Sequence, residues 1–242
     1  MVETIKCFSP VDGKLYASRP VASKKEIAAA FSAAHAAQEK WKRVSLKDRA
    51  AFCSAAVDAM LAMRDEIVPE LAWQMGRPIR YGAGELRGFE ERARHMIGIA
   101  EGALANHVPA AKEGFTRFIS REPWGVVFTI APWNYPYLTA VNSVIPALMA
   151  GNAVVLKHAS HTLLVAERFQ KAFDKAGLPK GVFQHLVMNH AQATDVISGG
   201  LVNMVCFTGS VAGGRAMEQA AAGRFINVGL ELGGKDPAYV RH

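Results

Sequence analysis

The sequence predicts an α/β fold, in which a parallel sheet carries helices on both faces and is preceded by an N-terminal helical region. From residue 113 onward, short apolar runs alternate with amphipathic segments of helical length. Before residue 113, apolar residues recur mostly at the three- and four-residue spacing of helices. Strands that alternate with helices form βαβ units, and right-handed crossovers place the helices on both faces of the sheet.

The N-terminal part, residues 1–112, is predicted to be mainly helical. Ser23 begins a helix, because its hydroxyl can cap the chain and Glu26 completes a capping box. Apolar periodicity continues through residues 46–63, and Gly76-Arg77-Pro78 breaks the next helix. Residues 85–102 form a further helix with a charged face.

The C-terminal part, residues 113–242, is predicted to alternate between strand and helix. Thr116–Arg121 alternates like a half-exposed strand, and Val126–Ile130 is a continuous apolar run typical of buried parallel strands. The same patterns predict helices over 137–149, 162–176, 191–198 and 211–222, and strands over 153–157, 182–187, 204–207 and 227–232.

Four residues with binding chemistry stand at or just past the ends of these predicted strands: Asn134, Lys157, Gly209 and Glu231. In open α/β sheets, ligands bind beyond the C-terminal ends of the strands. We therefore expect these residues to converge on one edge of the sheet.

The composition is that of a soluble globular protein, since half of the 242 residues are hydrophobic and a fifth are charged. The net charge of +7 suits an anionic ligand such as a dinucleotide. Lysines and arginines are scattered among acidic residues, so no nucleic-acid partner is expected. Three cysteines are too few for a disulfide framework and favour a reduced, cytoplasmic setting.

No membrane association is expected either. The first ten residues have no apolar run of the kind a signal peptide needs. The most apolar stretch, residues 137–156, contains Asn142, Pro146, Gly151 and Asn152, which argue against a membrane span.

Four short motifs occur in a fixed order: Ala131-Pro132-Trp133-Asn134-Tyr135-Pro136, Val155-Leu156-Lys157, Phe207-Thr208-Gly209-Ser210, and Leu230-Glu231-Leu232-Gly233-Gly234-Lys235. With these motifs the chain resembles the aldehyde dehydrogenase superfamily. The resemblance implies a Rossmann-like cofactor domain, NAD or NADP as the cofactor, and oxidation of an aldehyde substrate to a carboxylic acid. It also implies a homo-oligomer, with residues 115–127 contributing to an oligomerisation arm.

In that family a cysteine nucleophile follows the glutamate by a few dozen residues. Here eleven residues follow Glu231, and none is a cysteine. The sequence is therefore expected to be a truncated or split enzyme, namely the cofactor-binding portion whose catalytic domain lies elsewhere, for example on a partner chain. The alternative is a dinucleotide-binding module or pseudoenzyme without turnover.

The resemblance also implies the residues that hold the cofactor: Ile130, Trp133, Lys157, Ser160, Gly209 and Ser210. At Gly209, a strand leads into a helix, where a phosphate can approach the backbone and the helix dipole attracts it. An ordinary strand–helix turn is the alternative for this segment.

Lys157 is implied to bind the adenosine ribose, although a lysine also commonly marks the point where a strand meets water. Many NAD-preferring relatives carry a glutamate three residues later, and this chain has Ser160. A small neutral residue does not repel a 2′-phosphate, so NADP should be tolerated.

Two residues are implied to be catalytic. The Asn134 amide would donate to a developing oxyanion, and the alternative is a turn asparagine. Glu231 would be a base with a raised pKa that activates water, and the alternative is a partly solvated strand-end glutamate. Cys206 lies in an apolar strand and is interpreted as a small hydrophobe rather than a nucleophile.

No metal site is predicted. His158 and His161 are three residues apart, but no further ligands accompany them. We expect these two histidines to be solvated or hydrogen-bonded.

Overall fold

The computed structural model describes residues 3–241, and its centre is a five-stranded sheet in the order β5-β4-β3-β6-β7. All four neighbouring pairs run parallel, as the alternating pattern predicts. The strands are β3 (Val126–Ile130), β4 (Ala153–Lys157), β5 (Phe183–His185), β6 (Met204–Gly209) and β7 (Asn227–Leu232).

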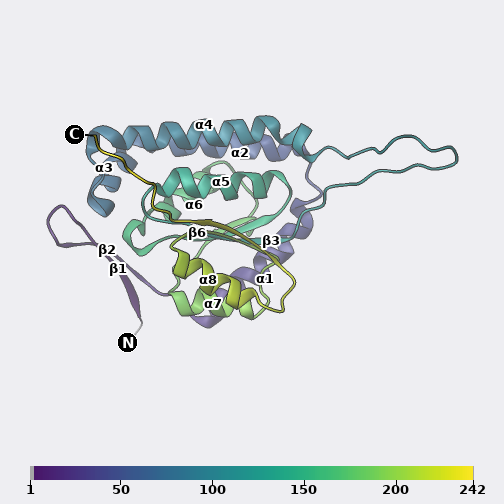
Figure 1. Ribbon diagram of the computed structural model, residues 1–242. Coiled ribbons are helices and arrows are strands. Elements are labelled where there is room, and N and C mark those ends of the chain that lie inside the picture. Colours follow the sequence, from purple (N-terminus) through teal and green to yellow (C-terminus); the bar gives the residue numbers. More distant parts are fainter. Residues whose placement is uncertain (1–2, 242) are drawn as a thin grey trace.

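Helices cover both faces of this sheet, which confirms the predicted α/β class (Figure 1). Along β3, Val127 points to one layer, while Val126 and Phe128 point to the other, as the two-residue period of a strand requires. One layer holds α2 (Leu46–Leu61), α4 (Ile79–Leu104), α5 (Pro136–Met149) and α6 (Val165–Lys175); the other holds α1 (Lys24–Trp41), α7 (His190–Ser198) and α8 (Val211–Ala221).

The helical boundaries in the N-terminal part follow the local signals. The Ser23 hydroxyl accepts the Glu26 N–H at 3.2 Å, and the Glu26 carboxylate accepts the Ser23 N–H at 2.7 Å, so the predicted capping box starts α1. Helix α3 (Arg64–Met75) ends at Gly76, which adopts the left-handed conformation that glycine tolerates.

Helix α1 joins the N-terminal part to the sheet. The side-chain amide of Gln38 donates to the Gly151 carbonyl at 3.1 Å, and the indole of Trp41 donates to the Leu148 carbonyl at 3.0 Å. Both bonds fix the turn that leads from α5 into β4. The two parts of the chain therefore share one core.

The hairpin of β1 (Thr4–Phe8) and β2 (Leu15–Pro20) was not anticipated from the sequence. Most of its side chains are exposed or half-buried, and Cys7 and Ala17 are the members that pack inward, against Leu163. This burial depends on a partner far along the chain, which a short apolar pattern cannot reveal.

The predicted strand over Thr116–Arg121 is wrong. Residues 105–124 instead form an extended arm that projects from the body, and all of Thr116–Arg121 is exposed (Figure 1). The arm folds back on itself at His107 and Ile119, whose backbones exchange hydrogen bonds of 3.0 and 2.8 Å. The alternation does not mark a buried face, because no second layer covers either side of the arm.

The apolar stretch over residues 137–156 is divided between α5, a turn at Gly151, and β4, as expected from its polar interruptions. In the described range, 3–241, we find no helix with the length and apolar character needed to span a bilayer.

Candidate functional site

A cavity of about 850 Å³ lies beyond the C-terminal ends of β3, β4, β6 and β7, where ligands of open α/β sheets bind. It contains seven of the eight residues singled out in the sequence: Ile130, Trp133, Asn134, Lys157, Gly209, Ser210 and Glu231. Ser160 is the exception, because it opens a 3₁₀ turn and is exposed, while its neighbour Ala159 lines the cavity. We call this cavity the sheet-end cleft.

Lys157 is the charged residue buried in the wall of this cleft, with 6% of its surface exposed. Its ammonium donates to the His158 carbonyl at 3.5 Å, and no carboxylate of the described residues lies within ion-pair distance. Burial lowers the pKa of Lys157. A buried ammonium with one long hydrogen bond is costly, so this position suits a polar or anionic ligand.

The N-terminus of α8 faces the same cleft. Ser210 caps this helix and accepts the Gly213 N–H at 3.1 Å. The preceding Gly209 has no room for a side chain, since a Cβ would lie 2.6 Å from the Phe207 ring. The remaining free N–H groups of the first turn, together with the helix dipole, favour an anion at this end of the cleft.

Asn134 lies at the rim of the cleft, in the segment between β3 and α5. Its backbone carbonyl accepts a hydrogen bond from Arg77, which comes from the break between α3 and α4. The sequence predicts a role for Asn134 but none for Arg77, because Gly76-Arg77-Pro78 carries no local signal beyond a helix break.

Glu231 stands near the end of the edge strand β7, opposite Thr208 on β6. Its side chain is exposed in the structure. Within the described residues β7 has a neighbour on one side only, and nothing covers the carboxylate. Glu231 therefore has the surroundings of a solvated glutamate near a strand end, which is the alternative given in the sequence analysis.

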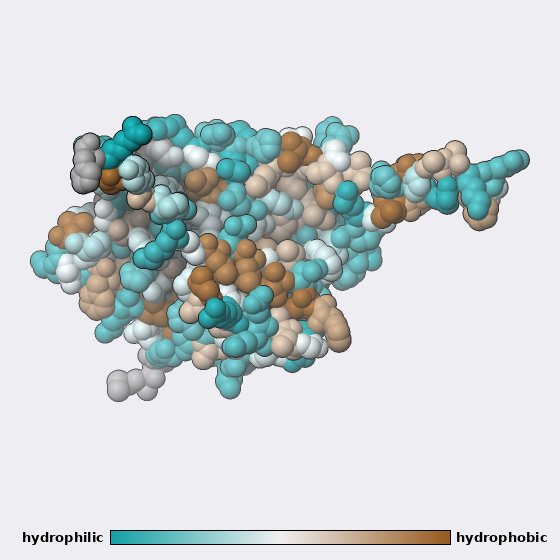
Figure 2. All heavy atoms as spheres, in the orientation of Figure 1, coloured by the Kyte–Doolittle hydropathy of each residue, from teal (hydrophilic) through white to brown (hydrophobic). Residues whose placement is uncertain are grey.

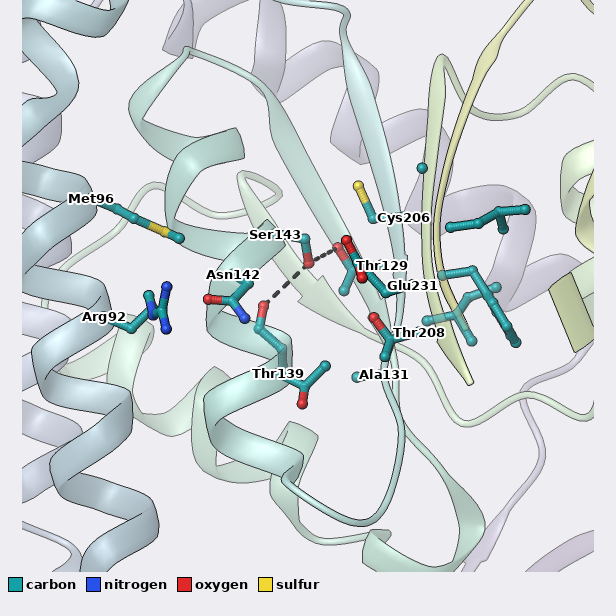
Figure 3. A pocket seen from close by; sticks show the side chains of 15 residues that line it. Arg92, Met96, Thr129, Ala131, Thr139, Asn142, Ser143, Cys206, Thr208 and Glu231 are labelled. Atoms are coloured by element: carbon teal, nitrogen blue, oxygen red, sulfur yellow. Dashed lines mark hydrogen bonds between the residues drawn. The ribbon is translucent and has the colours of Figure 1, made fainter. Parts of the chain in front are cut away.

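A second cavity, of about 550 Å³, lies on the opposite side of the sheet ends, between α4, α5 and strands β3, β6 and β7. Figure 3 shows Arg92 and Met96 extending from α4 toward α5, and Cys206 and Thr208 standing on the strands. Ser143 is hydrogen-bonded to Thr129 at 3.1 Å in its wall. The two cavities share five lining residues, namely Ile130, Ala131, Phe207, Thr208 and Glu231.

None of the three thiols has the properties of an activated nucleophile. Burial raises the pKa of Cys206 to about 11 and that of Cys53 to about 12, and it also raises the pKa of Cys7. A thiol with a raised pKa is protonated at neutral pH and is a weak nucleophile. Cys206 lines the second cavity but not the sheet-end cleft.

His158 is a buried, hydrogen-bonded histidine. Its Nδ1 accepts the Ala159 N–H at 2.9 Å, so Nε2 carries the proton and donates to the Pro136 carbonyl at 3.2 Å. Burial lowers the pKa of His158 to about 4, which keeps the ring neutral. Among residues 3–241 there is no group of three or more side chains suited to hold a metal ion.

Comparison with known proteins links this geometry to one family. The model of the aldehyde dehydrogenase family matches residues 1–242. The 3,6-anhydro-alpha-L-galactose dehydrogenase of Streptomyces coelicolor is 36% identical over 98% of this chain and 48% of its own length. The D-glyceraldehyde dehydrogenase (NADP(+)) of Picrophilus torridus is 28% identical over 98% of this chain and 48% of its own length.

Solved structures of aldehyde dehydrogenases also match the fold of this chain. The crystal structure of the NAD-dependent aldehyde dehydrogenase from Sinorhizobium meliloti superposes with a TM-score of 0.90 at 33% identity, covering 97% of this chain and 48% of that one. The chain thus spans about half the length of the curated relatives it matches.

Proposed function

Because the chain belongs to the aldehyde dehydrogenase family, we propose that it supplies the Rossmann-like, dinucleotide-binding part of an enzyme that oxidises an aldehyde to a carboxylic acid with NAD or NADP. The observation that carries the proposal is Lys157, a buried ammonium without a carboxylate partner, in the wall of the sheet-end cleft. A charge in this position is stabilised when a polar ligand occupies the cleft.

In this proposal the dinucleotide lies along the cleft. Lys157 would bind ribose hydroxyls at one end, and the N-terminus of α8 behind Gly209 and Ser210 would face the pyrophosphate. Ile130 and Trp133 lie on the β3 side of the cleft, where a ring can pack. When bound, the nicotinamide supplies the acceptor for a hydride from the substrate.

The chain's own polar groups suggest how it assists the reaction. The Asn134 amide would donate a hydrogen bond to the oxygen that becomes negatively charged, and Glu231 would take a proton from water. Glu231 lines both cavities, which supports a dinucleotide on one side of it and the aldehyde on the other.

We propose that NADP is accepted as well as NAD. Ser160 is small, neutral and exposed beside Ala159, at the end of the cleft that Lys157 occupies. The acidic side chain in the cleft wall is Glu231, which lies on another strand. A 2′-phosphate near Lys157 would therefore meet a positive charge and no carboxylate.

Two surfaces support assembly with partners. The arm over residues 105–124 exposes several large apolar side chains that suit contacts between copies in a homo-oligomer: Val108, Phe115, Phe118, Ile119 and Trp124. The outer edge of β7 is suited to a partner that brings the catalytic half. The three free cysteines support a reduced, cytoplasmic setting for such an assembly.

A dinucleotide-binding module without turnover is the second candidate. The state of the thiols favours it, because burial raises the pKa of all three and none lines the sheet-end cleft. In this alternative the cleft still binds a dinucleotide, and Asn134 and Glu231 have no reaction to assist.

Titration of the purified chain with NADH and NADPH, followed by calorimetry or nicotinamide fluorescence, tests the proposal. We expect both to bind, and Lys157→Ala to weaken binding at least about tenfold while the exposed Lys25→Ala does not. A wild-type chain that binds neither dinucleotide would refute the proposal. A preference for NADH over NADPH of a hundredfold or more would refute its NADP part.

A further inference from the structure

We propose that Arg77 and Glu85 are positioning residues, which clamp the segment that carries Asn134 and so set where this asparagine lies at the rim of the cleft. The two side chains form an ion pair between Arg77 Nη1 and Glu85 Oε2 at 2.8 Å. The role assigned to Asn134 comes from the proposed function, whereas the clamp itself is argued from contacts alone.

Glu85 caps a helix that has no cap of its own. Helix α5 starts at Pro136, and its N-cap residue Tyr135 makes no side-chain hydrogen bond. The Glu85 carboxylate, on α4, accepts the N–H groups of Tyr137 and Leu138 at 3.0 and 3.1 Å. These are two of the N–H donors that the first turn of a helix leaves unpaired. A negative carboxylate at this place also interacts favourably with the positive end of the helix dipole.

Arg77 holds the other end of the same short segment. One nitrogen of its guanidinium binds Glu85, and the other donates to the Asn134 carbonyl. The guanidinium also lies over the Tyr135 ring, 4.5 Å from its centroid. A planar group with several donors can make all three contacts at once, which a lysine cannot.

The clamp is buried, and its polar atoms are paired. The Glu85 side chain has no exposed surface and that of Arg77 is 11% exposed. Both Glu85 oxygens are bonded, Oε1 to the two backbone N–H groups and Oε2 to Arg77. In contrast, the Asn134 side chain is at the exposed rim, so its position depends on its backbone. A group that donates to a developing charge has to be held within about 0.5 Å of its productive place.

The test exchanges the planar guanidinium of Arg77 for an ammonium, which keeps the positive charge. Arg77→Lys retains the ion pair with Glu85 but loses the simultaneous contacts to Asn134 and Tyr135. We expect a melting temperature close to that of the wild type, together with a moved Asn134 side-chain amide resonance in ¹H–¹⁵N spectra of the labelled chain. A merely structural role would be rescued by lysine, and the resonance would stay in place.

The matched control is Arg94→Lys. Arg94 lies on α4 and pairs with Glu90 and Asp58, but it touches no part of the Asn134 segment in the described structure. An unmoved Asn134 resonance in Arg77→Lys would overturn the proposal. A shift that Arg94→Lys reproduces would overturn it too, because the cause would then be a general loosening of α4.

Glu85→Gln provides a second variant should Arg77→Lys not fold. It keeps the oxygen that accepts the Tyr137 and Leu138 N–H groups and loses the charge that orients Arg77, so the Asn134 resonance is again expected to move; an unmoved one would overturn the clamp. These spectra need no ligand. If the wild-type chain binds neither NADH nor NADPH while the resonance moves as expected, the proposed function fails and the clamp stands.

Discussion

Glu231 and Thr208 lie opposite each other on the ladder between β7 and β6, at the place where the two cavities meet. Each residue lines both cavities, so a molecule on either side of the sheet ends can reach this pair. Parallel strands bring their C-terminal ends to one edge, and this is why residues 23 positions apart in the sequence become neighbours.

Lys157→Met should stabilise the free chain while it weakens dinucleotide binding. Burial lowers the pKa of Lys157 below its ordinary value, so the charged form costs folding free energy at neutral pH, and the cost falls as the pH rises from the lowered pKa toward 10.5. We expect a gain of about 1 kcal/mol in the free energy of unfolding at pH 7, measured by urea denaturation. A loss of stability would show that the ammonium has a partner that stabilises it.

His158 should make the chain sensitive to mild acid. Burial holds the pKa of His158 at about 4, below the unfolded value of 6.5, so its contribution is complete above pH 6.5 and is lost as the pH falls through 4. The loss amounts to about 3 kcal/mol over this window. Denaturation curves of wild type and His158→Gln between pH 7 and 4 should converge, and parallel curves would contradict the prediction.

Arg77→Ala should be strongly destabilising, by about 3 kcal/mol, because it leaves the Glu85 carboxylate buried without its partner. Burial is already the main factor that raises the pKa of Glu85. The double variant Arg77→Ala/Glu85→Gln should recover part of the loss, since the buried charge is then gone. Additive effects in this double-mutant cycle, measured by thermal and urea denaturation, would indicate that the two side chains act independently.

The purified 242-residue chain should not oxidise aldehydes above background. All three thiols have a raised pKa, and Cys206 lies outside the cleft that Asn134 lines. The measurement is the rise in absorbance at the NAD(P)H band with a simple aldehyde. Rapid formation of reduced cofactor would contradict the prediction, and activity that survives Cys206→Ser would show that Cys206 is not the nucleophile.

The chain should associate through its arm. Phe118 and Ile119 are more than half exposed on the projecting arm, where Figure 2 shows apolar side chains among polar ones. Phe118→Asp together with Ile119→Asp should shift the chain to a smaller species in light scattering coupled to size exclusion. A wild-type chain that is monomeric and stable at all concentrations would refute the prediction.

The alternating half of the fold can be predicted from the order of the residues. Between β3 and β7, strand and helix periods differ clearly, and every predicted strand from Val126 to Leu232 appears with its ends shifted by at most a few residues. The convergence of Asn134, Lys157, Gly209 and Glu231 could also be predicted, because it depends only on strand direction. The cofactor-binding and catalytic roles of these four residues remain predictions.

The remaining features depend on contacts between segments that are distant in the chain. The hairpin of β1 and β2 packs on the body where Cys7 and Ala17 meet Leu163. The Arg77–Glu85 clamp joins a helix break to a helix start more than fifty residues later. Likewise, Glu231 is exposed because β7 is an edge strand, which the local pattern around it does not encode. Local periodicity records which face of an element is apolar, whereas burial of a single polar group depends on which distant segment covers it.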